Sequence, residues 1–333
     1  MNPISMQPPK ISVLGPYEVK CFCKYFKGID ILLAKRFSCG FVPHEEHLTL
    51  ILCELLDERA SKLHLLPYSL SDLNNDLRKN GGLLQSDVSI STTDYNKTQE
   101  GHTTYSDIGI VLTYQDYIEP NNNFQKGILL QAKKLFPTSF GYDLSSVYES
   151  FDIAQHQKLE NLNKSYVEKG CGNECIKYLM YNPCLEALPK REQQMVLHQQ
   201  MRLDATSIFD YTIGLQRYRE LIEGEQSSIL NLGCLLTSID NIHELAAKAA
   251  KASRTNKTLY KFTLESLIES INVYESSLSW FFVFDLMMRG VGCSCQDFIQ
   301  LVRYGENTGM ARLLEITPPK YCIELTITAG SEQ

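Results

Sequence analysis

The hydrophobic pattern between residues 44 and 183 most constrains the fold, because it changes repeatedly between helical and strand spacing. Residues 44–60 carry apolar side chains at helical spacing, and Pro43 stands where a helix accepts proline. Three strand patterns follow, then a helical pattern, then a fourth strand pattern, at residues 83–93, 105–114, 128–135, 144–167 and 176–181. This order of helix, three strands, helix and strand predicts an α/β (α+β) fold.

The chain divides by pattern into three parts. Residues 1–40 give no clear pattern and stay unassigned, whereas residues 41–184 hold the alternating core. Within that core, residues 119–127 are rich in asparagine and predict a loop. Residues 185–333 predict a helix-rich accessory region, with one strand at 229–236 and helices over 259–304.

Composition indicates a globular protein, since 44% of residues are hydrophobic and 21% are charged. The first ten residues lack the apolar core of a secretory signal, and the longest apolar cluster, residues 280–284, is far shorter than the roughly 20 residues of a membrane span. We therefore expect a cytoplasmic protein with no membrane partner. Eleven cysteines spread over the chain predict reduced thiols rather than a disulfide framework.

Three polar residues on the second and third predicted strands form the candidate chemical site. Asp107 begins one strand, and Gln131 and Lys133 end the next. Alternate side chains of a strand share a face, so Gln131 and Lys133 point the same way and can converge with Asp107. An Asp107 carboxylate, a Gln131 carbonyl and a backbone oxygen suit Mg²⁺ (or Mn²⁺), while Lys133 can orient or deprotonate an attacking water. This set predicts phosphodiester hydrolysis.

These residues resemble the PD-(D/E)xK, or restriction-endonuclease-like, nuclease superfamily. The resemblance lies in Ser106-Asp107 before an apolar strand and in the run Ile128-Leu129-Leu130-Gln131-Ala132-Lys133, within the αβββαβ order of residues 44 to 183. Gln131 replaces the usual glutamate or aspartate, as in the QxK variant, and removes one formal charge. The resemblance implies a mixed sheet and a metal-dependent endonuclease, with DNA as the expected substrate, acting in anti-phage defence or restriction.

The resemblance also implies a further carboxylate from the helix before the sheet, and Glu45 and Glu46 are the candidates. Glu45 shares a helical face with Leu48 and Leu52, the side that packs on the sheet, whereas Glu46 lies about 100° around the helix. Glu45 is therefore the preferred third metal ligand. Acidic residues in a first turn also interact favourably with the helix dipole, which is the ordinary structural reason for both.

A net charge of −7 means that any nucleic-acid contact must be a local basic surface. Basic residues recur every three positions in one alanine-containing helical stretch, which is typical of a solvated helix face but also suits a phosphate backbone. The candidate nucleic-acid contacts are Lys134, Lys248, Lys251, Arg254 and Lys257, and the resemblance adds Gln155 or Gln157, on the helix after the third strand, as contacts to the site or the phosphate.

Other metal or nucleophile patterns are weaker. The sets Cys21/Cys23/Cys39, Cys171/Cys175/Cys184 and Cys293/Cys295 lack the paired CxxC spacing of a structural zinc site, and buried free cysteine is the simpler explanation. His44 and His47 lack an HExxH pattern and are interpreted as surface or helix-start residues.

Two other functional classes stay open beside the nuclease. One is a catalytically inactive nuclease fold that binds nucleic acid, for which the neutral Gln131 is the signal. The other is a sensor or interaction protein in which residues 185–333 recognise an activating partner protein or ligand. Double-strand cutting by this fold often needs a dimer, so the resemblance is also compatible with a homo-oligomer.

Overall fold

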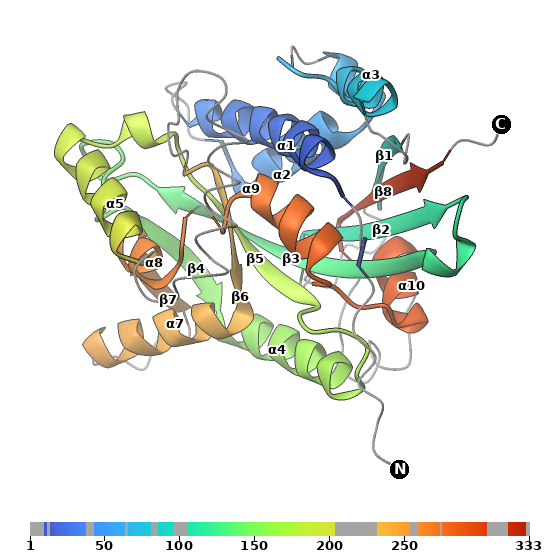
Figure 1. Ribbon diagram of the computed structural model, residues 1–333. Coiled ribbons are helices and arrows are strands. Elements are labelled where there is room, and N and C mark those ends of the chain that lie inside the picture. The colour runs from blue at the N-terminus through green and yellow to red at the C-terminus, as the bar shows by residue number, and fades with distance from the viewer. Residues whose placement is uncertain are drawn as a thin grey trace.

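The computed structural model describes residues 10–11, 14–37, 43–63, 66–80, 86–95, 106–203, 232–253, 259–273, 275–304 and 319–330. Figure 1 shows a layer of helices on each face of a mixed sheet. The strands are β1 (Asp87–Asp94), β2 (Ile108–Asp116), β3 (Phe124–Phe136), β4 (Val147–Asp152), β5 (Ile176–Tyr181), β6 (Cys234–Ser238), β7 (Leu259–Thr263) and β8 (Tyr321–Ala329). The described helices are α1 (Pro16–Arg36), α2 (Glu45–Leu56), α3 (Leu70–Asn80), α4 (Ile153–Glu168), α5 (Lys190–Leu203), α7 (Ile239–Ser253), α8 (Leu264–Ser270), α9 (Leu278–Trp280) and α10 (Gln296–Tyr304), with a π-helical segment, η5 (Phe281–Met288), and short 3-10 turns η1 (Ala60–Leu63), η3 (Pro120–Asn122) and η4 (Leu185–Ala187).

The sheet has eight strands in the order β1-β8-β2-β3-β4-β7, and β5 pairs with both β3 and β6. Strand β3 is central because its first half pairs antiparallel with β2 and its second half pairs parallel with β5. Strand β8 lies between β1 and β2, antiparallel to the first and parallel to the second. Strands from residues 234–329 and strands from residues 87–181 therefore share one sheet.

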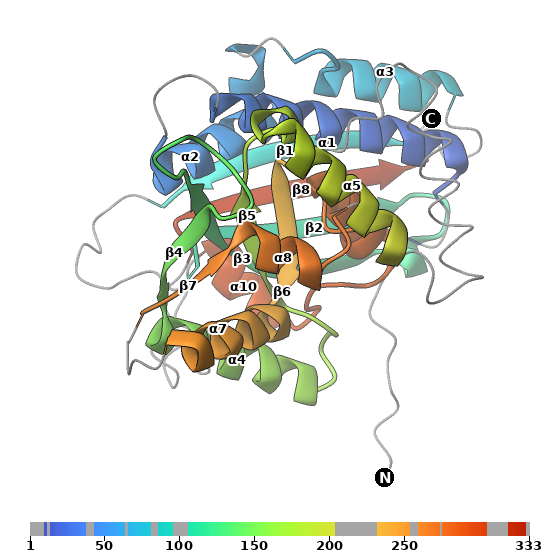
Figure 2. The same cartoon turned by 90° about the vertical axis from the view of Figure 1, so that its left-hand side faces the viewer.

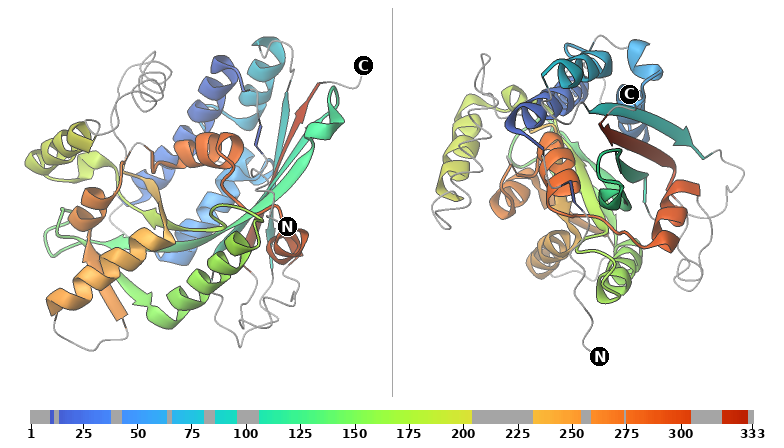
Figure 3. Two further views of the ribbon diagram at one scale, coloured as in Figure 1. Left: turned by 60° about the horizontal axis from the view of Figure 1, so that its bottom comes forward. Right: turned by 45° about the vertical axis from the view of Figure 1, so that its right-hand side comes forward.

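Two hydrophobic clusters cover the two faces of the sheet. Helices α1, α2 and α3 pack on one face against alternate β3 residues Ile128, Leu130 and Ala132. Helices α4, α7, α8 and α10 pack on the other, against the intervening Leu129 and Leu135. Figure 2 shows the sheet between these layers, and Figure 3 shows α4 and α7, which are in contact, on the same side. Residues 129, 131, 133 and 135 therefore face the α4 side.

The predicted α/β class and the mixed sheet are confirmed, and helix α2 and strands β1, β2, β3 and β5 appear in the predicted order. The predicted helix over 144–167 is wrong in its first part, because β4 occupies Val147–Asp152. Valine, tyrosine and phenylalanine favour a strand there. The helix α4 begins only after Asp152, whose carboxylate accepts hydrogen bonds from the backbone N–H groups of Ala154 and Gln155.

The C-terminal half contains more strand than predicted. The helical interpretation of residues 259–304 is wrong at its start, where β7 pairs antiparallel with β4. The strand predicted at 229–236 is described from residue 232 onward, with β6 at Cys234–Ser238. None of the described helices is long and apolar enough to cross a membrane.

Candidate active site

The candidate site lies beside the start of β2, where β3 continues beyond its last pair with β2. Ile108, the first residue of β2, pairs with Leu130, and β3 runs on to Phe136. Beyond Leu130, the backbone N–H groups of β3 on the edge that β2 covers earlier in the strand need other acceptors. The Asp107 Oδ2 atom accepts from Ala132 N at 2.7 Å, and the Glu45 Oε2 atom accepts from Lys134 N at 3.0 Å. Two carboxylates thus take the place of a neighbouring strand.

Gln131 joins the first of these carboxylates to helix α4. Its side chain is 3% exposed, on the α4 side of β3. The Gln131 Nε2 group donates to Asp107 Oδ2 at 2.6 Å, and Gln131 Oε1 accepts from Gln155 Nε2 at 2.9 Å. Gln131 therefore presents its NH₂ group to Asp107, and its oxygen to α4.

Lys133 lies on the same face, two residues further along β3. It is 7% exposed, and its Nζ atom lies 3.6 Å from Glu45 Oε1 and 6.0 Å from the centre of the Phe151 ring. A buried ammonium needs a negative partner, and Glu45 supplies it. The site thus holds two carboxylates and a lysine that neutralises part of their charge.

Burial and like charge make Asp107 a weak acid in the folded chain. Burial, and after it the charge of Glu45, raise the pKa of Asp107 to about 7, against the lowering effect of the Lys133 charge. Burial also raises the pKa of Glu45, against the lowering effect of Lys133. A cation placed here would favour the ionised form of both acids.

The side-chain oxygens present are hard donors of the kind that Mg²⁺ and Mn²⁺ prefer. Within the part of the chain that the structure describes, Asp107 Oδ1 accepts no hydrogen bond, and Glu45 Oε1 has only the long contact to Lys133. The Gln131 amide oxygen could join these donors only after the amide turns over. The amide of Gln155 would then have to turn as well, because its Nε2 group now donates to that oxygen. The donor set fits a hard divalent cation on this condition.

The structure brings together Glu45, Asp107, Gln131, Lys133 and Gln155 from the sequence-based set. Glu46 lies outside it, since its side chain is 79% exposed and pairs with Lys320 at 3.4 Å. Of the two glutamates, Glu45 therefore faces β3, and Glu46 faces solvent.

The expected nucleic-acid contacts are scattered. Lys134 points to the opposite face, where its Nζ atom donates to Pro43 O at 2.9 Å, so its ammonium is turned away from Lys133. Gln157 and Lys248 are exposed on α4 and α7. The Lys251 side chain, Arg254 and Lys257 lie outside the described residues.

Sequence reasoning missed Lys320 and Tyr178. Lys320 precedes β8, whose first residue donates its backbone N–H to Asp107 O, and the Lys320 charge lowers the Asp107 pKa. Tyr178 lies on β5 opposite Gln131. No local pattern signals either residue, because both approach the site through pairing of distant strands.

Comparison with known proteins identifies no relative. The chain matches no protein-family model, no curated protein and no solved structure.

Replacing Asp107 with asparagine should remove a pH dependence of stability. With a pKa of about 7 in the folded chain and about 3.9 unfolded, Asp107 holds a proton between these values only when folded. The free energy of unfolding therefore falls as pH rises through this window. The measurement is urea unfolding of the metal-free chain between about pH 4 and about pH 7. Over this range the free energy of unfolding of wild type should fall by on the order of 3 kcal/mol more than that of Asp107→Asn. A difference between the two proteins that does not vary with pH would contradict the prediction.

Proposed function

We propose that this chain is a divalent-metal-dependent nuclease of the PD-(D/E)xK type, hydrolysing phosphodiester bonds of DNA with Mg²⁺ or Mn²⁺. The observation that carries the proposal is the joint placement of Asp107, Gln131 and Lys133, with Glu45, at one end of β2. A weakly ionised carboxylate, an amide and a held ammonium suit a reaction that needs a cation and a positioned water.

Asp107 and Gln131 would hold the cation, Asp107 through Oδ1 and Gln131 through its amide oxygen once turned. When bound, the cation lowers the pKa of a water and neutralises charge on the phosphate. Glu45 and Asp107 accept from N–H groups two residues apart on β3, about 7 Å along a strand. Since Mg²⁺ keeps several of its waters, Glu45 would act through one of these waters.

Lys133 would hold the attacking water and stabilise negative charge that develops on the phosphate oxygens. Glu45 holds the Lys133 ammonium at 3.6 Å, and the charge of Lys133 lowers the pKa of Asp107. Gln155 would fix the orientation of the Gln131 amide. Each of these roles is assigned to a side chain whose contacts limit its freedom.

The biological setting rests on the resemblance alone. It includes action in anti-phage defence or restriction and a homo-oligomer, whereas the cytoplasmic location and the activating partner or ligand are expectations from the sequence pattern. The chain as a whole is acidic, so DNA would contact a local basic surface. Exposed Lys248 on α7 is one described candidate.

Cleavage assays on the purified full chain test the proposal. Supercoiled plasmid, single-stranded DNA and RNA are incubated with Mg²⁺, Mn²⁺ or chelator, using wild type, Asp107→Asn and the control Asp94→Asn. Asp94 is exposed at the end of β1. We expect metal-dependent DNA cleavage by wild type and by the control, and none by Asp107→Asn. Cleavage that persists in Asp107→Asn would overturn the assignment.

The inactive nucleic-acid-binding alternative gives a different result. The neutral Gln131 is the feature that favours it, because an amide binds a cation less strongly than a carboxylate. In that case no protein cleaves, while DNA binding persists and calorimetry finds no Mg²⁺ or Mn²⁺ binding that depends on Asp107. That outcome would replace the enzyme proposal with the binding one.

A further inference from the structure

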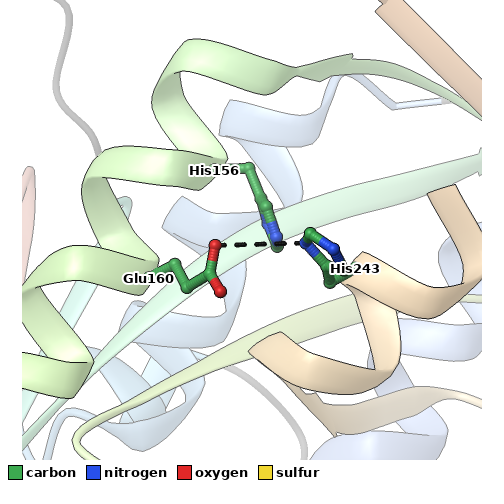
Figure 4. Close-up of side chains that lie close together, drawn as sticks. All are labelled: His156, Glu160 and His243. Carbon is green, nitrogen blue, oxygen red and sulfur yellow. Dashed lines mark ion pairs between the residues drawn. The ribbon is translucent and has the colours of Figure 1, made fainter. Parts of the chain in front are cut away.

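A second cluster of polar side chains lies between helices α4 and α7. His156 and Glu160 are four residues apart on α4 and share a face. His243 approaches them from α7. One ligand atom from each of the three residues lies within 4.8 Å of the other two, and Figure 4 shows the three side chains converging from the two helices.

His156 carries the strongest indication of a ligand. Its side chain is 8% exposed, and its Nε2 atom is buried without a hydrogen-bond partner in the part of the chain described. A buried polar atom left in this way is costly and calls for an explanation. Burial lowers the pKa of His156, which favours the neutral ring.

Tyr178 orients the His156 ring from β5. The Tyr178 hydroxyl lies 2.9 Å from His156 Nδ1. When Nδ1 carries the proton and donates to the hydroxyl, the Nε2 lone pair is directed away from Tyr178 and toward Glu160 and His243. Metal-binding histidines have this arrangement, in which a polar partner on the second ring nitrogen fixes the tautomer.

Glu160 and His243 leave the cluster open to solvent. Glu160 Oε1 accepts from Lys164 Nζ at 2.7 Å, which lowers the Glu160 pKa and keeps it ionised. The other oxygen, Oε2, lies 3.9 Å from His243 Nδ1, and His243 is 59% exposed. A surface pair at that distance contributes little to stability, and it does not explain the partnerless His156 Nε2.

We propose that His156 Nε2, Glu160 Oε2 and His243 bind a divalent transition-metal ion, with Zn²⁺ the best match. Two imidazoles and one carboxylate suit Zn²⁺, whereas Mg²⁺ and Ca²⁺ prefer oxygen donors alone. Ligand atoms of a tetrahedral zinc site lie about 3.4 Å apart. Closing from the present spacing therefore needs shifts of about 1 Å, which the exposed His243 can supply, and a fourth position faces water.

This site is distinct from the one around Asp107, and the proposal does not depend on nuclease activity. The two sites nevertheless share neighbouring residues, because Gln155 precedes His156 on α4 and Tyr178 lies opposite Gln131. Metal binding at His156 would fix α4 against α7.

A competing set of zinc ligands must be separated in the test. The thiols of Cys175 and Cys293 contact each other, and Cys171 contacts Cys293 and Cys295. Among the described residues, no three of these sulfur atoms lie as close together as the ligand atoms of the histidine cluster. A metal bound by sulfur would also have a different spectrum.

Cobalt spectroscopy on the full chain tests the site. Metal-free protein in excess Mg²⁺, which occupies sites of oxygen donors, is titrated with Co²⁺ and then with Zn²⁺. We expect visible cobalt bands without sulfur-to-cobalt charge transfer, displaced by Zn²⁺. Affinity should fall at least about tenfold in His243→Ala and in Glu160→Gln, and be unchanged in the exposed controls His47→Ala and Glu244→Gln.

A further variant tests the role of the His156 ring without replacing this buried residue. Tyr178→Phe removes only the hydroxyl that orients the ring, and should weaken Co²⁺ binding about tenfold while thermal unfolding confirms a folded chain. Binding that is unchanged in His243→Ala and Glu160→Gln overturns the proposal. Charge-transfer bands that disappear in Cys171→Ser overturn it as well, and place the metal at the cysteines.

Discussion

Replacing Lys133 with methionine should slow DNA cleavage by about 1000-fold, the range lost when a positioned acid–base or electrostatic group is removed. Methionine keeps the apolar stem of the buried side chain but removes the ammonium that lies 3.6 Å from Glu45 Oε1. The expected loss is in the rate of the chemical step, because Lys133 is assigned to the water and the phosphate rather than to the cation.

The measurement must separate Lys133 chemistry from its effect on Asp107. The charge of Lys133 lowers the Asp107 pKa, so its removal moves that pKa above about 7 and weakens cation binding near neutrality. Cleavage rates should therefore be compared under saturating Mg²⁺ over a series of rising pH values, at the pH where the rate of each protein no longer increases and Asp107 is ionised in both.

Lys134→Met is the matched control, since Lys134 follows on the same strand but donates to Pro43 O on the opposite face. It should unfold at a lower temperature, because a buried hydrogen bond is lost, yet keep the cleavage rate within a few-fold of wild type. Equal losses of rate in both variants would mean that the positive charge of this strand end, and not the position of Lys133, is what matters.

The parts of the site that sequence predicts are those fixed by short-range geometry. The two-residue period of a strand places Gln131 and Lys133 on one face, and helix geometry separates Glu45 from Glu46. Antiparallel pairing of β2 with β3 then brings Asp107 beside Gln131. Each step needs only residues that are near in sequence or joined by one loop.

The parts that sequence reasoning missed depend on distant pairing. The run Tyr321–Ala329 alternates buried and partly buried residues, a strand signal that could have been recognised. Its position between β1 and β2, which places Lys320 near Asp107, could not, because strand order depends on the packing of the whole sheet. The histidine cluster has the same origin: His156 and Glu160 are visibly four residues apart, but His243 joins them only through the contact of α4 with α7.

The direction of the Gln131 amide also lies beyond sequence reasoning. The sequence indicates an oxygen donor, whereas the structure presents the NH₂ group to Asp107 and the oxygen to Gln155. The acceptor Asp107, just before β2, and the donor Gln155, on α4, decide this orientation, and neither belongs to β3. Binding of the proposed cation through Gln131 would therefore have a cost, since the amides of Gln131 and Gln155 would both have to turn over first.

Replacing Gln131 with glutamate should remove that cost and raise Mg²⁺ affinity about 10- to 100-fold at about pH 8. The new carboxylate offers an oxygen to the cation in either orientation and adds a negative charge beside Asp107. It can still accept the hydrogen bond that Gln155 Nε2 now donates to Gln131 Oε1. Calorimetric titration with Mg²⁺ measures the change.

The gain should depend steeply on pH, which distinguishes direct binding from a general charge effect. In the metal-free variant two adjacent carboxyl groups would share a proton, so the Asp107 pKa would rise above its present value of about 7. Below that value Mg²⁺ must displace the proton, and the advantage over wild type should shrink at about pH 6. The control is Gln125→Glu, near the start of β3, where Gln125 donates to Thr113 Oγ1. It adds the same charge away from Asp107 and should leave the Mg²⁺ affinity within about twofold of wild type. If the Mg²⁺ affinity of Gln131→Glu at about pH 8 equals that of wild type, residue 131 does not contact the ion. Asp107 would then have to bind Mg²⁺ without a ligand from the Gln131-Ala132-Lys133 segment.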